Sequence, residues 1–180
     1  MKVIITLAKI FNVPDPKAGK RTGFAEMVKA GKKIHTCREN YPYWKGKIDT
    51  LKENGGQLCV REWTGRPYRS TQGDVVELDS SLVEVERLDI RRKERPRKKE
   101  SIYIPEVHLE DFEFSIGGKP VGADVMQRVA ENDGFTRLED FLIYFDLTFR
   151  HTPPDEEGGD TKTLTLAIIH FRPFRYMGEN

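Results

Sequence analysis

The stretch Gly31-Lys32-Lys33-Ile34-His35-Thr36-Cys37-Arg38 places a glycine, two lysines, a hydroxyl group and an arginine in one short span. The sequence before it predicts a helix over about 22–30 that ends at Gly31, because glycine readily adopts the left-handed conformation that stops a helix. A strand over 33–38 is expected directly afterwards. The polar side chains then lie at a junction between two elements, where binding sites are often built. The same spacing also fits a half-exposed strand whose cationic side chains face water.

Short, sequential strands outnumber the helices that the sequence predicts. Outward from the octapeptide, we expect strands at 2–8, 57–63, 74–79, 82–90, 102–104, 107–114 and 163–171, and helices at 41–53, 121–130 and 136–149. These elements indicate one α+β domain over residues 1–180, with a mixed, mostly antiparallel sheet and flanking helices. Pairing of the final strand with the first would close the sheet into a barrel and remove exposed edges.

The composition describes a soluble globular protein, since 37% of the 180 residues are hydrophobic and 33% are charged. No stretch approaches the roughly 18 apolar residues of a membrane-spanning helix, and the apolar run within the first seven residues is too short for a secretion signal. A cytoplasmic protein is therefore expected. Cys37 and Cys59, the only cysteines, lack a second cysteine or a histidine pair at metal-ligand spacing. We expect buried, reduced thiols, no metal and no cofactor, although a disulfide would form if their strands brought the β-carbons together.

The net charge of +1 hides an uneven distribution. Residues 91–99, the basic run, contain seven basic side chains and one acidic side chain. Pro96 interrupts the strand pattern there, which predicts an exposed hairpin tip. Such a tip is either simply solvated, or contacts phosphates independently of sequence, or binds a protein partner.

The octapeptide reads as glycine, any residue, lysine, two of any kind, threonine, any residue and arginine. This pattern resembles the signature of the ASCH group within the PUA-like fold. The turn at 130–135, the segment Leu138-Glu139-Asp140-Phe141 and the strand predicted at 163–171 resemble later parts of ASCH proteins, whereas 61–120 matches only loosely. The resemblance implies a PUA-like β-barrel with flanking helices that binds RNA, a nucleotide or a nucleoside in a cleft.

Some small ASCH members hydrolyse the acyl amide of acetylated cytidine, with a lysine as base, a threonine as nucleophile and a glutamate as proton donor. By this resemblance the three roles fall on Lys33, Thr36 and Glu131. A hydroxyl group is a poor nucleophile unless a base removes its proton, and a lysine is a base only when its pKa is depressed. Nearby cations such as Lys32 and Arg38 would lower it.

Residues three apart on a regular strand point to opposite faces of the sheet. Lys33 and Thr36 therefore converge only if Lys33 precedes the strand or if a bulge intervenes. The turn after Gly31 favours the first arrangement.

The same residues also suit binding without catalysis. Lys33 and Arg38 would clamp a phosphate while Thr36 donates a hydrogen bond, and an exposed aromatic ring would stack on a base. The segment 61–70 combines three arginines with two aromatic residues, which suits an RNA-facing loop or a hairpin whose arginines pair with acids. The residues predicted to contact nucleic acid are Lys32, Lys33, Arg38, Tyr41, Arg61, Trp63, Tyr68, Arg69 and Ser70, with Tyr43 as a further stacking candidate. RNA or nucleotide binding is the first hypothesis, an amidohydrolase the second, and a protein-interaction module the third.

Overall fold

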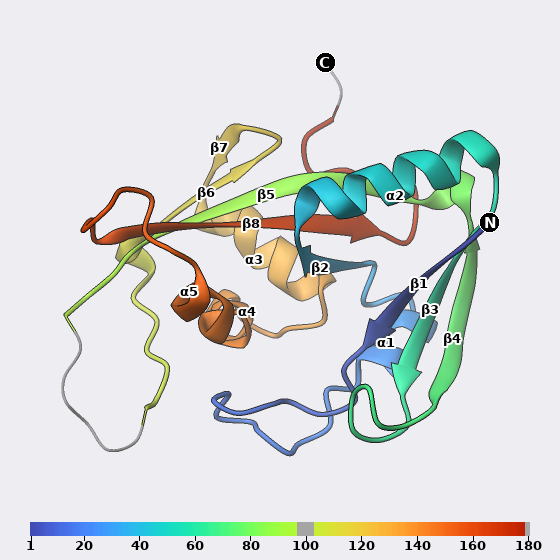
Figure 1. Ribbon diagram of the computed structural model, residues 1–180, viewed down its shortest axis with the longest axis horizontal. Coiled ribbons are helices and arrows are strands. Elements are labelled where there is room, and N and C mark those ends of the chain that lie inside the picture. Colours follow the sequence, from blue (N-terminus) through green and yellow to red (C-terminus); the bar gives the residue numbers. More distant parts are fainter. Residues whose placement is uncertain (97–102, 179–180) are drawn as a thin grey trace.

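The computed structural model describes residues 1–96 and 103–178, which form an α+β fold with two mostly antiparallel sheets (Figure 1). Its helices and strands in chain order are β1 (Lys2–Leu7), α1 (Phe24–Lys29), β2 (His35–Glu39), α2 (Tyr41–Asn54), β3 (Gln57–Trp63), β4 (Gln72–Asp79), β5 (Glu84–Lys93), β6 (Phe112–Ile116), β7 (Lys119–Val121), α3 (Ala123–Asn132), α4 (Leu138–Tyr144), α5 (Asp146–His151) and β8 (Thr161–His170). Short 3-10 turns precede β5 and β6. The strand predicted at 107–114 lies later, at β6, and residues 103–108 form no strand.

The strands form a sheet of five in the order β2-β8-β5-β6-β7 and a sheet of three in the order β1-β3-β4. Neighbours in the larger sheet are antiparallel, whereas β1 runs parallel to β3. The prediction that the final strand pairs with the first is wrong, because β8 has β2 on one edge and β5 on the other. Both edges of β8 are therefore occupied, and β1 pairs with β3 instead. Among the described strands no closed barrel forms.

One hydrophobic core joins the two sheets. It includes Val3 and Leu58 from the smaller sheet and Ile90 and Leu166 from the larger sheet. Helix α2 lies across one side of the larger sheet, and α3, α4 and α5 lie on the other side (Figure 1). Complete burial of a side chain such as Phe141 on α4 stabilises the fold by about 1.5–3 kcal/mol.

The helix predicted over 136–149 is two helices, α4 and α5, with a break at Phe145. The buried Asp146 carboxylate at the start of α5 accepts hydrogen bonds from Arg92 Nη1 at 2.8 Å and from Tyr103 Oη at 2.6 Å. These partners come from distant segments, so helical periodicity alone did not reveal the break.

The basic run does not form the predicted hairpin tip over its described part. Residues 91–93 are the end of β5 and pair with β6 and β8. Arg92 Nη2 lies 2.6 Å from Glu94 Oε1, and Arg95 contacts acidic side chains just before β6. These described cations are therefore balanced by acids, and residues 97–99 lie outside the described part of the chain.

Two further features bear on the predictions from composition. In the described ranges no helix is long and apolar enough to cross a membrane. Cys37 in β2 and Cys59 in β3 are buried and unbonded, which confirms the prediction of free, buried thiols. They lie in different sheets and fill space in the interior.

Candidate functional site

A cavity of about 190 Å³ lies where the octapeptide meets the turn that follows α3. The two segments are about one hundred residues apart in the sequence. Lys33 of the first and Asp133 of the second both line the cavity and form a hydrogen bond with each other. Further lining residues come from the end of β1, from α1 and from the α4–α5 pair; the whole set is Leu7, Ala8, Phe24, Lys33, Thr36, Cys37, Arg38, Glu39, Asp133, Phe135, Tyr144, Phe145 and Thr148. The octapeptide and the turn at 130–135 therefore meet at one cavity.

Backbone hydrogen bonds hold the octapeptide in this position. Helix α1 ends near Gly31, which has φ +68°, and the amide of Lys33 then donates to the carbonyl of Met27 at 3.1 Å. The amide of Ile34 donates to the carbonyl of Asn132 at 2.9 Å, which ties the turn to the end of α3. Because β2 begins only at His35, Lys33 precedes the strand, as required for it to share the cavity with Thr36.

The floor of the cavity holds a buried ion pair. Lys33 Nζ lies 2.5 Å from Asp133 Oδ1 and 2.5 Å from the Asp133 carbonyl oxygen, and the two side chains are 2% and 4% exposed. Burial lowers the pKa of Lys33, against the raising effect of the carboxylate. Burial alone would raise the pKa of Asp133, but the Lys33 charge and the contacts with Lys33 and His35 lower it. Lys33 also lies 4.5 Å from the centre of the Phe24 ring, which adds a cation–π contact.

A second layer of polar side chains supports Asp133 from behind. His35 Nδ1 lies 3.6 Å from Asp133 Oδ1, and the other ring nitrogen of His35 lies 2.7 Å from Tyr176 Oη. Asn132 Nδ2 also donates to Tyr176 Oη at 2.7 Å. Burial lowers the pKa of His35 to about 4, so its ring is neutral at pH 7. The C-terminal segment thus helps to hold the acid in place.

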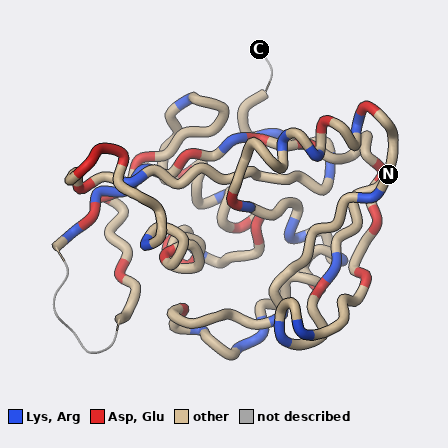
Figure 2. Tube along the Cα trace, viewed as in Figure 1, with Lys and Arg blue, Asp and Glu red and all other residues tan. Residues whose placement is uncertain are grey.

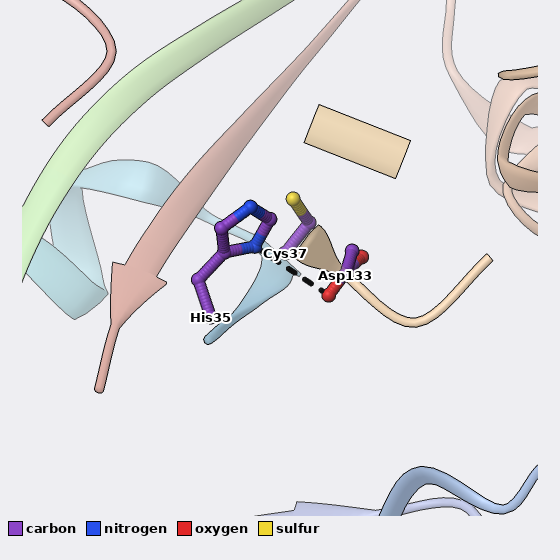
Figure 3. A group of neighbouring side chains, drawn as sticks. All are labelled: His35, Cys37 and Asp133. Atoms are coloured by element: carbon purple, nitrogen blue, oxygen red, sulfur yellow. Dashed lines mark ion pairs between the residues drawn. The ribbon is translucent and has the colours of Figure 1, made fainter. Parts of the chain in front are cut away.

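Figure 3 shows that His35, Cys37 and Asp133 point toward one another. Their potential metal-ligand atoms lie within 4.8 Å of one another, and all three residues are buried. However, the Lys33 ammonium group already contacts the Asp133 oxygen that faces His35. A divalent cation bound there would meet a like charge, and burial raises the pKa of the Cys37 thiol well above its usual value. This group therefore acts as the support of Asp133.

Arg38 is the cation of the cavity that remains available to a ligand. Its Nη2 donates to the carbonyl oxygen of Thr6, while its Nε is buried without a hydrogen-bond partner among the described residues. In the described part of the chain, no acidic side chain forms an ion pair with Arg38. Thr36 is buried beside it on the cavity wall. An unpaired guanidinium donor next to a hydroxyl group is suited to an anionic or carbonyl oxygen.

The acid beside Lys33 in the cavity is Asp133, whereas the resemblance predicts Glu131. Glu131 is exposed on α3, where its carboxylate accepts a hydrogen bond from Gln127 Nε2 at 2.8 Å, and it does not line the cavity. Tyr144 was also missed as a lining residue. The sequence offered one signal for Asp133, a carboxylate directly before a glycine in the turn Asn132-Asp133-Gly134. In the structure this glycine has φ +94°.

The remaining predicted contacts lie outside the cavity. Lys32 is exposed, and Tyr41 at the start of α2 is half-buried against the core. Arg61 Nε lies 2.8 Å from Asp74 Oδ1 across the β3–β4 hairpin. The other four predicted residues of segment 61–70 stay together at the far end of this hairpin, namely Trp63, Tyr68, Arg69 and Ser70.

The cavity thus combines a buried ion pair, a hydroxyl group, aromatic rings and a guanidinium group that forms no ion pair with a described acid. No family model matches the chain, and the comparisons with curated proteins and with solved structures also give no match. Function therefore has to be inferred from the chemistry of this cavity and from the motifs that build it.

Proposed function

We propose that this chain is an ASCH-like protein of the PUA-like class that binds a nucleotide or nucleoside, free or within RNA, in the cavity. One observation carries the proposal: Lys33, Thr36 and Arg38 of the octapeptide line the same cavity as Asp133 of the distant turn. The resemblance of both segments to ASCH proteins supports it. Under this proposal the two sheets correspond to a PUA-like barrel that is incompletely closed.

The size and chemistry of the cavity fit one base of a nucleotide, with a cation nearby for its phosphate. About 190 Å³ is room for a single small ring system, and Phe135 and Tyr144 provide apolar wall. Asp133 and Thr36 offer hydrogen-bonding groups for the edge of a base, and the guanidinium group of Arg38, which forms no ion pair with a described acid, offers a positive charge for a phosphate. The ammonium group of Lys33 donates a hydrogen bond to Asp133. Lys33 therefore orients this acid and does not bind the phosphate.

The test is a titration of the full chain with cytidine monophosphate, other nucleoside monophosphates and short RNA. Replacing Arg38→Ala removes the guanidinium group and is expected to weaken binding about tenfold or more, as for a charged hydrogen bond. Arg172→Ala, at an exposed arginine that does not line the cavity, is the control and should bind like the wild type. Absence of binding for all these ligands, or an unchanged affinity in Arg38→Ala, would contradict the proposal.

A second candidate function is hydrolysis of an acylated nucleoside, and the shared position of Lys33 and Thr36 favours it. The Thr36 hydroxyl would attack the acyl carbon and pass its proton to a neutral Lys33, a state that burial favours by lowering the pKa of Lys33. The amine would leave with a proton, and water would then hydrolyse the acyl ester on Thr36. Asp133 has a lowered pKa and stays ionised, so it would hold Lys33 in place, and Lys33 would return the proton taken from Thr36 to the leaving amine.

Incubation with acetylcytidine tests the second candidate, with release of acetate and cytidine as the readout. Thr36→Ala should abolish release, whereas Glu131→Gln should leave it unchanged because Glu131 is outside the cavity. No release by the wild type, or equal release by Thr36→Ala, would remove hydrolysis as a function of this cavity and leave the binding proposal standing.

A further inference from the structure

The far end of the β3–β4 hairpin displays two aromatic rings. Trp63 and Tyr68 lie 5.3 Å apart between ring centres with a tilt of 52°, and Tyr68 is 91% exposed. Tyr68 has φ +62°, a left-handed conformation that costs a residue with a side chain about 1–2 kcal/mol. Burial of the ring does not offset this cost, because the ring faces water. An exposed aromatic ring held in a costly conformation suggests that it contacts a ligand.

The turn that carries these rings is ordered by its own hydrogen bonds. Ser70 Oγ accepts from the amide of Gly65 at 3.0 Å and donates to the carbonyl of Arg66 at 2.8 Å. The amide of Arg69 donates to the same carbonyl at 3.2 Å. Ser70, which the sequence analysis assigned to ligand contact, therefore shapes the turn, while the side chains of Arg66 and Arg69 remain exposed.

Cations gather around this hairpin end. Figure 2 shows basic segments where the hairpin meets the loop that follows β1. In the described residues, Arg66, Arg69, Lys9 and Lys29 form no ion pair with an acid. Lys9 and Lys29 are nonetheless close enough to Glu62 to act on its pKa, which burial raises. The hairpin end is therefore a positively charged rim with one exposed ring, Tyr68, beside the half-buried ring of Trp63.

Adjacent residues of the loop after β1 link the cavity to the rim. Ala8 lines the cavity, and its neighbour Lys9 places Nζ 3.4 Å from the carbonyl oxygen of Thr64 on the hairpin. Lys9 and the hairpin end therefore lie near the cavity on the side of Ala8. Exposed rings accept stacked bases, with about 1–3 kcal/mol per base, and unpaired cations accept phosphates.

We propose that Trp63, Arg66, Tyr68 and Arg69 form a hairpin surface that binds the single-stranded RNA flanking the nucleotide in the cavity. The inference rests on the proposed function, and it identifies the ligand class as an RNA strand instead of a free mononucleotide. A single strand fits better than a duplex, because one base must leave its stack to enter the cavity while its neighbours stack on the exposed rings. An acidic peptide would use the cations but would leave the stacking faces without a partner.

The experiment compares cytidine monophosphate with an unstructured RNA of about eight nucleotides, a typical length for a single-strand site. The wild type should bind the RNA at least about tenfold more tightly than the mononucleotide, because stacking and phosphate contacts add to the cavity. Tyr68→Ala should weaken RNA binding about fivefold or more and leave mononucleotide binding unchanged. Arg66→Ala/Arg69→Ala should also make RNA binding less dependent on salt, by about 1.4 in the logarithmic slope.

The control is Lys119→Ala/Arg172→Ala, which removes the same number of exposed, unpaired cations from other parts of the described surface. It should keep the RNA affinity and most of the salt slope. Equal affinity for RNA and mononucleotide, or RNA binding unchanged by Tyr68→Ala, would overturn the proposal of a hairpin surface. The proposed function would still stand if the mononucleotide bound. Failure of both ligands would overturn the proposed function and the inference with it. Tyr68-dependent binding of an acidic peptide in place of RNA would assign the surface to a protein partner.

Discussion

The Asp133 carboxylate lies 2.5 Å from Lys33 Nζ, and both side chains are almost fully buried. Removing one partner of such a pair leaves a buried, uncompensated charge, which costs about 3–5 kcal/mol. We therefore expect Asp133→Asn to lower the free energy of unfolding by that amount, measured by urea denaturation. Adding Lys33→Met in the same chain should recover part of the loss, because it removes the orphaned ammonium group.

Asp74→Asn provides the matched control for this prediction. Asp74 also forms an ion pair, with Arg61, but its side chain is 71% exposed. Exposed pairs contribute about 0–1 kcal/mol, so this variant should stay close to the wild type. If Asp133→Asn were as stable as Asp74→Asn, the buried ion pair would not exist in solution.

His35 should make stability depend on pH in a range where most side chains do not titrate. Its pKa in the fold is about 4, below the value of 6.5 in the unfolded chain. Between these values the unfolded chain binds a proton that the fold does not, so stability falls as the pH is lowered from 6.5 to 4, by up to about 3 kcal/mol. Urea denaturation at several pH values measures this loss.

The comparison that isolates His35 uses two substitutions. His35→Gln should remove much of the pH dependence between 6.5 and 4, because the titrating ring is gone. His108→Gln, at a histidine whose side chain is 39% exposed, should retain the wild-type dependence. An identical dependence in all three chains would show that His35 titrates normally and is accessible to water.

At the scale of elements, the pattern of apolar residues in the sequence predicted the helices and strands that depend on interactions within one segment. Strand β3 begins and ends as predicted, and α2 is longer by one residue, because alternation and helical spacing are properties of the segment itself. The end of β5 was missed because residues 91–93 look like a solvated basic loop, although acids from other segments pair with them. The choice of Glu131 over Asp133 failed because α3 continues to Asn132, so Glu131 stays on the exposed face of the last helical turn.

The turn after α3 depends on a glycine that faces α1. Gly134 has φ +94°, and a Cβ atom there would lie 3.1 Å from Met27 Sδ and from Phe24 Cδ1. Gly158 also has a positive φ, +73°, but a Cβ atom there would meet open space. Both alanine variants lose about 1–2 kcal/mol from the backbone, and Gly134→Ala should lose a further 1–3 kcal/mol or so from crowding.

Thermal or urea denaturation of the two glycine variants measures that difference. Gly134→Ala should also weaken nucleotide binding, because Phe24 lines the cavity and Asp133 precedes the altered residue. Gly158→Ala should bind normally. Equal stability of the two variants would mean that the turn relaxes away from α1 at little cost.

At the scale of the whole molecule, the sequence indicated an α+β fold but not two separate sheets. Residues 166–170 of β8 are buried on both faces of the larger sheet. This burial depends on helices that pack on each side of the sheet. Helix α2 contacts both β1 of the smaller sheet and β5 and β8 of the larger sheet. The cavity lies against this arrangement, with walls from β1, β2 and the α4–α5 pair. The position of the site therefore follows from the packing of the two sheets.

A shared core should make the two sheets unfold together. Trp44 on α2 packs against the core, and Trp63 ends β3 of the smaller sheet, so the two tryptophans report on different parts of the molecule. Trp63→Phe leaves Trp44 as the only fluorescent tryptophan, and Trp44→Phe leaves Trp63. In each variant, the urea midpoints from fluorescence and from far-ultraviolet circular dichroism should coincide, as for one cooperative unit. A lower fluorescence midpoint in Trp44→Phe alone would mean that the smaller sheet opens first and that the core through α2 does not couple the two sheets.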